Sequence, residues 1–195
     1  MFSKAFFEFP TLETGRLILR EIKVEDIEQV YEIFKSEEVA EFSSHYPVKS
    51  KGHILKAINR WRFEYADKIQ VRWGIARKED NLIIGTCCLG DFDEESKRCE
   101  IGYHLSHHQW NKGYMTEALK EIVRFGFEDN DVNRIEAFVT PQNQSSVTVL
   151  KKIGFVEEGL LRERDFFKGQ FQDGIVLGML KKDYILLLNE MHKQS

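Results

Sequence analysis

The stretch CEIGYHLSHHQWNKGYMTEAL, residues 99–119, decides which fold this chain adopts. Cys99–Leu105 has the composition of a strand, and apolar residues recur at helical spacing from Thr116 to about Glu128. The turn Gln109–Thr116 joins the two segments. The stretch therefore predicts a strand, a tight turn and a long helix in succession.

The turn before this helix has the properties of a phosphate site. The first N–H groups of a helix lack intrahelical partners, and the helix dipole places partial positive charge there. Gly113 lets the backbone approach a phosphate closely, and Lys112 adds a cation. On spacing alone an ordinary strand-to-helix turn explains the same residues, because many glycines precede helices.

Upstream of this stretch, periodicity predicts one strand, two helices and an antiparallel meander. Arg16–Ile22 alternates apolar and polar residues, and Lys51–Ala66 repeats apolar residues at helical spacing. Strand-like runs separated by short polar turns indicate the meander. The predicted elements are a strand at Arg16–Ile22, a helix at Val24–Phe34, a loop at Ser43–Ser50, a helix at Lys51–Ala66, and strands at Val71–Ala76, Leu82–Leu89 and Cys99–Leu105.

Downstream, the chain alternates strands and helices to its end. Gly154 follows a short helical pattern at the position typical of a residue just past a helix end. The predicted elements are strands at Arg134–Val139, Phe155–Leu161 and Ile175–Leu180, and helices at Ser145–Ile153 and from Lys182 to about Met191. We expect one domain over residues 1–195, with a mixed α/β sheet and helices packed on it.

Composition excludes several classes of protein. The 195 residues, 42% of them hydrophobic, supply one sizeable core. A net charge of -4 lacks the basic field of a nucleic-acid binder, so we expect no nucleic-acid partner. Apolar runs such as Tyr184–Leu188 are too short to cross a bilayer, and Met1–Pro10 lacks the pattern of a secretory signal. We therefore expect no membrane association.

The three cysteines, Cys87, Cys88 and Cys99, do not describe a disulfide framework or a zinc site, because their count is odd and C-x-x-C spacing is absent. No set of His, Cys and Asp residues has metal-ligand spacing, so we expect no metal. Free thiols favour a reducing, cytoplasmic location.

Residues 99–119 resemble the acetyl-CoA-binding core of the GNAT superfamily of N-acetyltransferases. They look most like the branch that contains RimJ and RimL, which acetylate the N-termini of ribosomal proteins. NQSSVTVLKKIGFVEEGLLR (143–162) resembles the second signature of that branch, DFFKGQFQDGIVLGMLKKDY (165–184) its C-terminal strand pair, and TGRLILREIKVEDIEQVYEI (14–33) its opening strand and helix. The resemblance implies an α/β (α+β) GNAT fold, with a mixed, mostly antiparallel seven-stranded sheet and helices on both faces.

The resemblance also implies where acetyl-CoA, as co-substrate, would bind: where Cys99–Leu105 diverges from Arg134–Val139. Main-chain groups would pair with the pantetheine arm, and backbone N–H groups around Gly113 would hold the pyrophosphate. The predicted cofactor-binding residues are Tyr103, His104, Leu105, Trp110, Asn111, Lys112, Gly113, Tyr114, Met115, Thr116 and Asn143. Trp110 and Met115 depart from the general superfamily turn, which has Gln or Arg and Gly or Ala there, and Met115 has bulk that could crowd the cofactor. Asn143 could bond the pantetheine, cap the following helix, or do both.

Acetyl transfer from a thioester to an amine needs a neutral amine, donors for the carbonyl oxygen and a proton for the departing thiolate. Direct attack needs no covalent nucleophile. By resemblance, Ser146 is expected to protonate the thiolate; a solvated serine in the first helical turn is the alternative. Glu100 is the first candidate for a general base acting through a water, with burial raising its pKa. A strand carboxylate paired with Lys97 or Arg98 is its alternative, and His104 is the rival base.

The acceptor side is less defined by the sequence. Six aromatic residues could line an acceptor groove or belong to the core: Phe42, Tyr46, Trp61, Trp73, Phe166 and Phe167. An acidic patch of Glu37, Glu38 and Glu41 could attract a cationic amine or form a solvated helix end.

Three functions follow as expectations. The first is acetylation of a protein N-terminal amine, and the second is acetylation of a polyamine, an aminoglycoside or another small amine. The third is a CoA-binding module without catalysis. An exposed C-terminal strand could also support a homodimer.

Overall fold

A single mixed sheet organises the computed structural model, which describes residues 3–193. Eight strands lie in the order β1-β2-β3-β4-β5-β6-β8-β7, and every neighbouring pair is antiparallel except β5 with β6. The strands are β1 (Leu12–Glu13), β2 (Leu17–Glu21), β3 (Gln70–Arg77), β4 (Ile83–Asp93), β5 (Arg98–Leu105), β6 (Arg134–Val139), β7 (Val156–Phe167) and β8 (Gln170–Leu180). The predicted antiparallel meander is β3-β4-β5.

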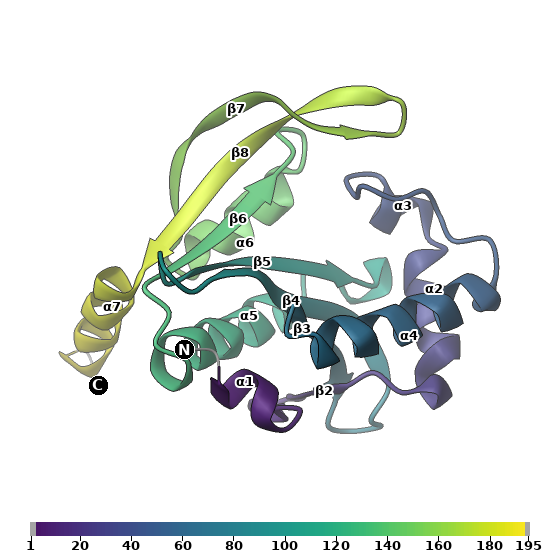
Figure 1. Cartoon of the computed structure of the whole chain (residues 1–195), viewed down its shortest axis with the longest axis horizontal. Helices are drawn as coiled ribbons and strands as arrows, with labels where there is room; N and C mark the ends of the chain where they lie inside the picture. Colours follow the sequence, from purple (N-terminus) through teal and green to yellow (C-terminus); the bar gives the residue numbers. More distant parts are fainter. Residues whose placement is uncertain (1–2, 194–195) are drawn as a thin grey trace.

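Helices cover both faces of this sheet, as predicted (Figure 1). The α-helices are α1 (Ser3–Phe7), α2 (Ile27–Phe34), α3 (Glu37–Ala40), α4 (Lys51–Ala66), α5 (Tyr114–Arg124), α6 (Gln144–Lys152) and α7 (Lys181–Lys193). Short 3-10 turns lie at Val24–Asp26 and His107–Gln109, and a π turn at Phe125–Asp129 extends α5.

Two apolar cores result, one on each face. The larger core joins α5 to the sheet through residues such as Leu119, Ile122 and Cys99. The smaller core holds α2 and α4 on the other face through residues such as Val30 and Ile58. Side chains along β5 alternate between the faces, so each β5 residue belongs to one side only.

The sheet has eight strands where seven were predicted. The added strand, β1, is only two residues long, and two residues carry no periodicity that a pattern could detect. Helix α1 was also not predicted; its Ala5 is buried in the larger core, and the Ala5 N–H donates to Asn130 Oδ1 at 3.0 Å.

Strands β7 and β8 form a hairpin longer than predicted. The predicted strands were Phe155–Leu161 and Ile175–Leu180, but pairing continues to Phe167 and Gln170. These outer arms are largely exposed, so no buried face imposes a periodic pattern on their sequence, and the backbone ladder holds them. Figure 1 shows the hairpin reaching past the sheet toward α3.

No helix within residues 3–193 is long and apolar enough to cross a membrane.

Candidate active site

A gap opens in the sheet between β5 and β6. These strands pair in parallel over three residue pairs, and the last joins Glu100 to Glu136. Beyond that pair β5 continues to Leu105 against β4, and β6 continues to Val139 against β8. Figure 1 shows the two strands diverging. The facing edges of these strand ends therefore have backbone groups without a ladder partner in the sheet.

Residues of β5 that follow this branch point alternate between the two faces. Cys99 and Ile101 are buried in the larger core, and Tyr103 packs against that core. Glu100 and His104 lie on the opposite face, where the His104 ring contacts Phe34 of α2. The two predicted catalytic groups, Glu100 and Ser146, are consequently on opposite sides of β5.

Ser146 lies beside β5 on the larger-core side, because α6 begins there. The Ser146 Oγ and Tyr103 Oη atoms are 2.6 Å apart. Burial raises the pKa of Tyr103 to about 12, so the phenol is protonated at neutral pH. Ser146 is half-buried in this contact, in contrast to the solvated serine that was its alternative interpretation.

Asn143 fixes the start of α6. Its Oδ1 accepts hydrogen bonds from the Ser146 N–H at 3.2 Å and from Ser145 Oγ at 2.9 Å. This geometry is that of a helix N-cap. The capping role of Asn143 is therefore present, and it positions the backbone of Ser146.

Glu100 is the half-buried carboxylate at the branch point. Among the described residues, no cation lies close enough to form an ion pair with it. Lys97 instead pairs with Asp131 at 3.0 Å, and Arg98 with Glu136 at 3.1 Å. The alternative of a structural pairing with Lys97 or Arg98 is thus absent.

The surroundings of Glu100 raise its pKa above the ordinary value. Burial is the largest cause, and the positive charge of Arg164 opposes it. The nearby carboxylates of Asp91, Asp165 and Glu136 add to the rise. Such a shift moves the pKa of a carboxylate toward the range in which it accepts protons efficiently.

His104 is a weaker candidate base than its unperturbed pKa suggested. Burial and the charge of Arg72 lower the pKa of His104 to about 3. Its ring lies 5.0 Å from Phe34 and 5.4 Å from His45, and its Nδ1 atom is buried without a hydrogen-bond partner. His104 is therefore neutral at physiological pH and binds a proton poorly.

The turn before α5 leaves the helix start open. Gly113 is the N-cap residue, with φ of +78°, and no side chain caps the helix there. Asn111 also has a positive φ, of +61°. Among the described residues, no side chain therefore accepts from the first N–H groups of α5, and such free groups suit the binding of an anion.

The side chains of this turn are held by neighbouring groups. Trp110 Nε1 donates to the Leu105 carbonyl at 3.0 Å, and Lys112 Nζ donates to Gln109 Oε1 at 3.1 Å. Met115 is buried in the larger core, so its bulk lies away from the open helix start. Tyr114 packs against the same core, and Thr116 is half-buried in the first turn.

Arg16 adds a cation that the sequence did not single out. Its Nη1 donates to the Lys112 carbonyl at 3.0 Å, and its guanidinium lies 4.4 Å from the Tyr114 ring centroid. Its Nε also bonds Glu117 Oε2 at 2.6 Å. The contact spans 96 residues of sequence, which is why no local pattern indicated it.

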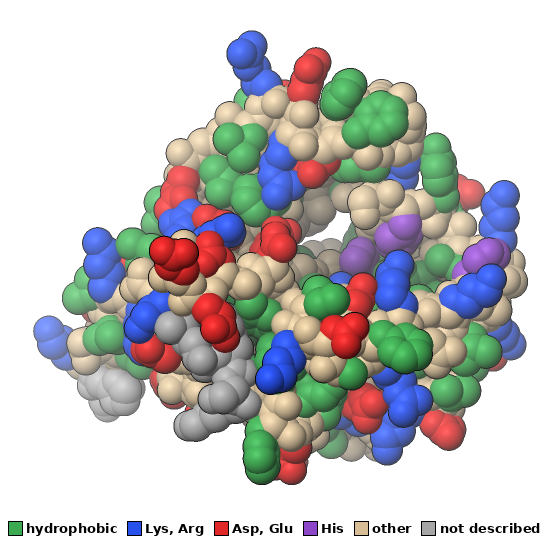
Figure 2. Space-filling model, in the orientation of Figure 1, with side chains coloured by type: hydrophobic (Ala, Val, Ile, Leu, Met, Phe, Trp, Pro, Cys, Tyr) green, Lys and Arg blue, Asp and Glu red, His purple; other side chains and the backbone are tan. Residues whose placement is uncertain are grey.

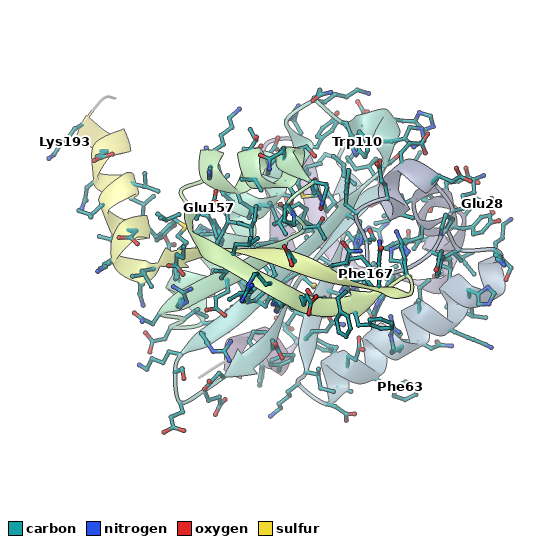
Figure 3. All side chains as sticks on the ribbon, turned by 90° about the horizontal axis from the view of Figure 1, so that it is seen from above. Glu28, Phe63, Trp110, Glu157, Phe167 and Lys193 are labelled. Carbon is teal, nitrogen blue, oxygen red and sulfur yellow. The ribbon has the colours of Figure 1, made fainter. Side chains whose placement is uncertain are left out.

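On the Glu100 face, the β7–β8 hairpin closes over the gap. Lys168, at the hairpin turn, donates to the carbonyl of Glu41 at 3.1 Å and also to that of Ala40. Figure 2 shows an opening between the hairpin and the body of the molecule, with histidine side chains along one edge and acidic groups along another. Figure 3, which labels Phe167, shows the hairpin passing across the sheet.

The six aromatic residues that could line an acceptor groove or belong to the core divide into two groups. Trp73 and Trp61 are buried in the two cores, so Trp73 is not a groove wall. Tyr46 and Phe166 are exposed, and Phe42 and Phe167 are half-buried. The exposed side chains of Glu37 and Glu38 lie on α3, and Glu41 follows it.

No group of three or more His, Cys, Asp or Glu side chains among the described residues could hold a metal ion.

Sequence comparisons give one domain assignment and several relatives. The profile of the acetyltransferase (GNAT) domain matches residues 16–156. The N-acetyltransferase p20 of Bacillus licheniformis is 34% identical over 177 residues, which are 89% of this chain and 98% of that protein. The ribosomal protein uS5-alanine N-acetyltransferase of Escherichia coli (strain K12) is 26% identical over 113 residues, which are 57% of this chain and 58% of that protein.

Solved structures share the architecture at lower identity. An acetyltransferase of the GNAT family from Bacillus anthracis superposes with a TM-score of 0.79 at 22% identity, covering 89% of this chain and 99% of that one. The spermidine N-acetyltransferase from Vibrio cholerae, solved with CoA and spermine, has a TM-score of 0.76 at 20% identity and covers 88% and 99% of the two chains. At these identities the likeness concerns the fold.

Proposed function

This chain belongs to the GNAT family of acetyl-CoA-dependent acetyltransferases, and we propose that it acetylates the N-terminal amine of a protein by direct attack in the gap between β5 and β6. One observation carries the proposal. The branch point places an unpaired carboxylate of raised pKa, Glu100, on one side of β5 and a Tyr103–Ser146 hydroxyl pair on the other. We infer that the two groups would act as base and acid, from opposite faces of the sheet, on substrates held in the gap.

Acetyl-CoA would bind on the α5–α6 side. The uncapped start of α5 at Gly113, with Arg16 beside it, suits a pyrophosphate, because free N–H groups and positive charge meet there. The remaining backbone groups of Asn111–Thr116 would contribute to the same cradle. The open edge of β5 near Tyr103–Leu105 suits the amide groups of pantetheine, although the Leu105 carbonyl already accepts from Trp110. The residues present thus fit the co-substrate.

Glu100 would take the proton of the attacking amine, through a water. As the amine nitrogen bonds to the acetyl carbon, the carbon–sulfur bond breaks and the thiolate leaves. The Ser146 hydroxyl would donate a proton or a hydrogen bond to the sulfur, and Tyr103 would support that hydroxyl. Asn143 would act by holding the first turn of α6 in place.

The similar proteins favour two different acceptors. The uS5-alanine N-acetyltransferase favours a protein N-terminus, and the spermidine N-acetyltransferase favours a polyamine. The acidic residues Glu37, Glu38 and Glu41 are the feature that would favour the polyamine. Glu37 and Glu38 are exposed on α3, and Glu41 is exposed just after it. The Glu38 carboxylate accepts a hydrogen bond from Ser36 Oγ at 2.6 Å.

The test is acetyl-CoA turnover against a panel of N-terminal peptides, spermidine and an aminoglycoside, with thiol release as the measurement. Cys87, Cys88 and Cys99 are buried, so the thiol reagent should see little background from the protein. We expect turnover with peptides. Turnover with spermidine alone would replace the acceptor, and tight CoA binding without any turnover would indicate a non-catalytic module.

A further inference from the structure

Arg72 of β3 forms no ion pair with a carboxylate of residues 3–193. Its half-buried guanidinium lies 5.2 Å from the Trp61 ring centroid, and its Nη2 contacts Gln70 Oε1 at 3.2 Å and Cys88 Sγ at 3.1 Å. Its Nε is buried with no hydrogen-bond partner, and no carboxylate of the described residues lies within ion-pairing distance. Because an unpaired buried polar atom costs free energy, this guanidinium would be stabilised by an anionic ligand.

The strand register places Arg72 beside the transfer site. Arg72 pairs with Cys88, and Cys88 pairs with Gly102, so the three residues form one row across β3, β4 and β5. A Cβ atom at Gly102 would lie only 3.2 Å from Cys88 Sγ, the atom that Arg72 contacts. Gly102 is flanked on the same face by Glu100 and His104.

The electrostatics of His104 agree with this placement, since the charge of Arg72 contributes to its lowered pKa. Another arginine on this face, Arg164, is already paired with Asp165 at 2.7 Å. Arg72 is therefore the cation near His104 that forms no ion pair with a carboxylate of the described residues.

A cavity of about 220 Å³ lies against Arg72, between α4 and the sheet. Phe9, Trp61 and Tyr65 contribute aromatic walls, and the Tyr65 hydroxyl is a second buried polar atom without a partner. Glu21 also lines the cavity, but its carboxylate lies 3.7 Å from Arg62, which offsets its charge. Whole ligand pockets are usually larger, roughly 300–1,000 Å³. The cavity accordingly suits one side chain or a small polar group rather than a complete ligand.

We propose that Arg72 binds a carboxylate of the amine acceptor, so that the preferred acceptor carries a carboxylate close to its reacting nitrogen. This inference rests on the proposed acetyl transfer to an amine. A carboxylate would satisfy the guanidinium with charge-assisted hydrogen bonds, whereas a polyamine would meet uncompensated positive charge. The carboxylate could come from an acidic side chain near a protein N-terminus or from the α-carboxylate of a small amino acid.

Matched acceptors test the proposal. One pair consists of peptides that differ only in Glu or Gln at the second residue, and the other of a free amino acid and its amide. The measurement is kcat/KM from thiol release at saturating acetyl-CoA. We expect the wild-type protein to prefer the carboxylate member of at least one pair by roughly tenfold or more, the size of one charge-assisted hydrogen bond. The pair that shows the preference identifies the source of the carboxylate.

Three variants locate the effect. Arg72→Gln should abolish the preference within the pair, and Arg72→Lys should retain part of it. Arg62→Gln is the matched control, because Arg62 lines the same cavity but is exposed and lies 3.7 Å from Glu21. The preference should survive in this control.

Equal kcat/KM values within both pairs for the wild type would overturn the inference, as would an unchanged preference in Arg72→Gln. Thermal unfolding shows whether Arg72→Gln folds. If it does not, an undiminished preference in Arg72→Lys would overturn the inference instead. Absence of turnover with every amine would instead contradict the proposed function. Turnover without a carboxylate preference would contradict the role of Arg72 and leave the proposed acetyl transfer standing.

Discussion

Glu100 combines two properties that oppose one another. Its position at the branch point suits a proton acceptor, but burial without a cationic partner disfavours its charged form. A carboxyl group whose pKa is raised on folding binds its proton more tightly in the folded state. The stability of the protein therefore falls as pH rises from the unfolded pKa, about 4.3, through the folded one.

We predict that Glu100→Gln lowers kcat/KM on the order of a hundredfold, the range of general-base catalysis. The wild-type kcat/KM should fall as pH drops through the raised pKa of Glu100, and the variant should lose that limb. The same variant should unfold at a higher temperature than the wild type at pH 7, with no gain below pH 4.

Glu136→Gln is the control for this prediction. Glu136 bonds Arg98 at 3.1 Å and Arg134 at 2.7 Å, so its removal should lower thermal stability at pH 7. If both variants shifted stability in the same direction, the burial argument for Glu100 would be wrong.

The second prediction at this scale concerns the phenol of Tyr103. Tyr103→Phe removes the 2.6 Å contact with Ser146 Oγ. We expect kcat to fall on the order of tenfold and the free energy of unfolding to fall by about 1 kcal/mol, the net worth of one hydrogen bond. Tyr184→Phe loses a similar contact, to Glu128 at 2.6 Å, away from the gap. An equal loss of kcat in both variants would remove the catalytic argument for Tyr103.

At the scale of elements, two glycines allow the effect of backbone strain to be distinguished from an effect on ligand binding at the start of α5. Gly113 and Gly169 have nearly the same backbone angle, φ of +78° and +81°. Alanine at either position should cost about 1 kcal/mol of stability, because a Cβ disfavours this conformation. We predict that only Gly113→Ala also raises the KM for acetyl-CoA, since Gly169 lies in the distant hairpin turn. An unchanged KM would argue against the α5 start as the pyrophosphate site.

Element boundaries were predictable where packing imposes periodicity. Helix α4 and strand β6 have the predicted bounds, Lys51–Ala66 and Arg134–Val139, because each buries one regular face. The outer arms of β7 and β8 have no buried face, so only backbone pairing defines them. Strand β1 is too short for any pattern.

At the scale of the molecule, the hairpin turn meets a segment far away in sequence. Lys168 contacts the carbonyl of Ala40, 128 residues earlier, and that of Glu41. This contact ties the hairpin turn to the end of α3 and the residue that follows it. It holds the loop after α3 at a fixed distance from the sheet.

We predict that Lys168→Met raises the KM for the acceptor severalfold and leaves the dissociation constant for CoA unchanged. Acceptor titrations and calorimetry with CoA are the measurements. Lys182→Met, an exposed lysine on α7, is the control and should change neither. A weakened affinity for CoA in Lys168→Met would mean that the hairpin organises the whole site rather than the acceptor side.

The same scale explains which parts of the site the sequence could indicate. The turn at Gly113 and the residues Glu100 and Ser146 lie in contiguous motifs, so the sequence alone could single them out as candidates. The roles proposed for Arg16 and Arg72 depend on contacts between distant segments, and a lone arginine in a strand has no distinguishing pattern. Likewise, the exclusion of His104 as a base depends on burial by residues from another element.

The placement of Glu100 and Ser146 on opposite faces of β5 has a kinetic consequence. Donor and acceptor would approach the gap through different faces, so neither would have to depart before the other arrives. A ternary complex should then assemble in either order, and initial-rate plots at several fixed acetyl-CoA concentrations should give intersecting lines. Parallel lines would require an acetylated protein intermediate, for which this two-sided gap provides no reason.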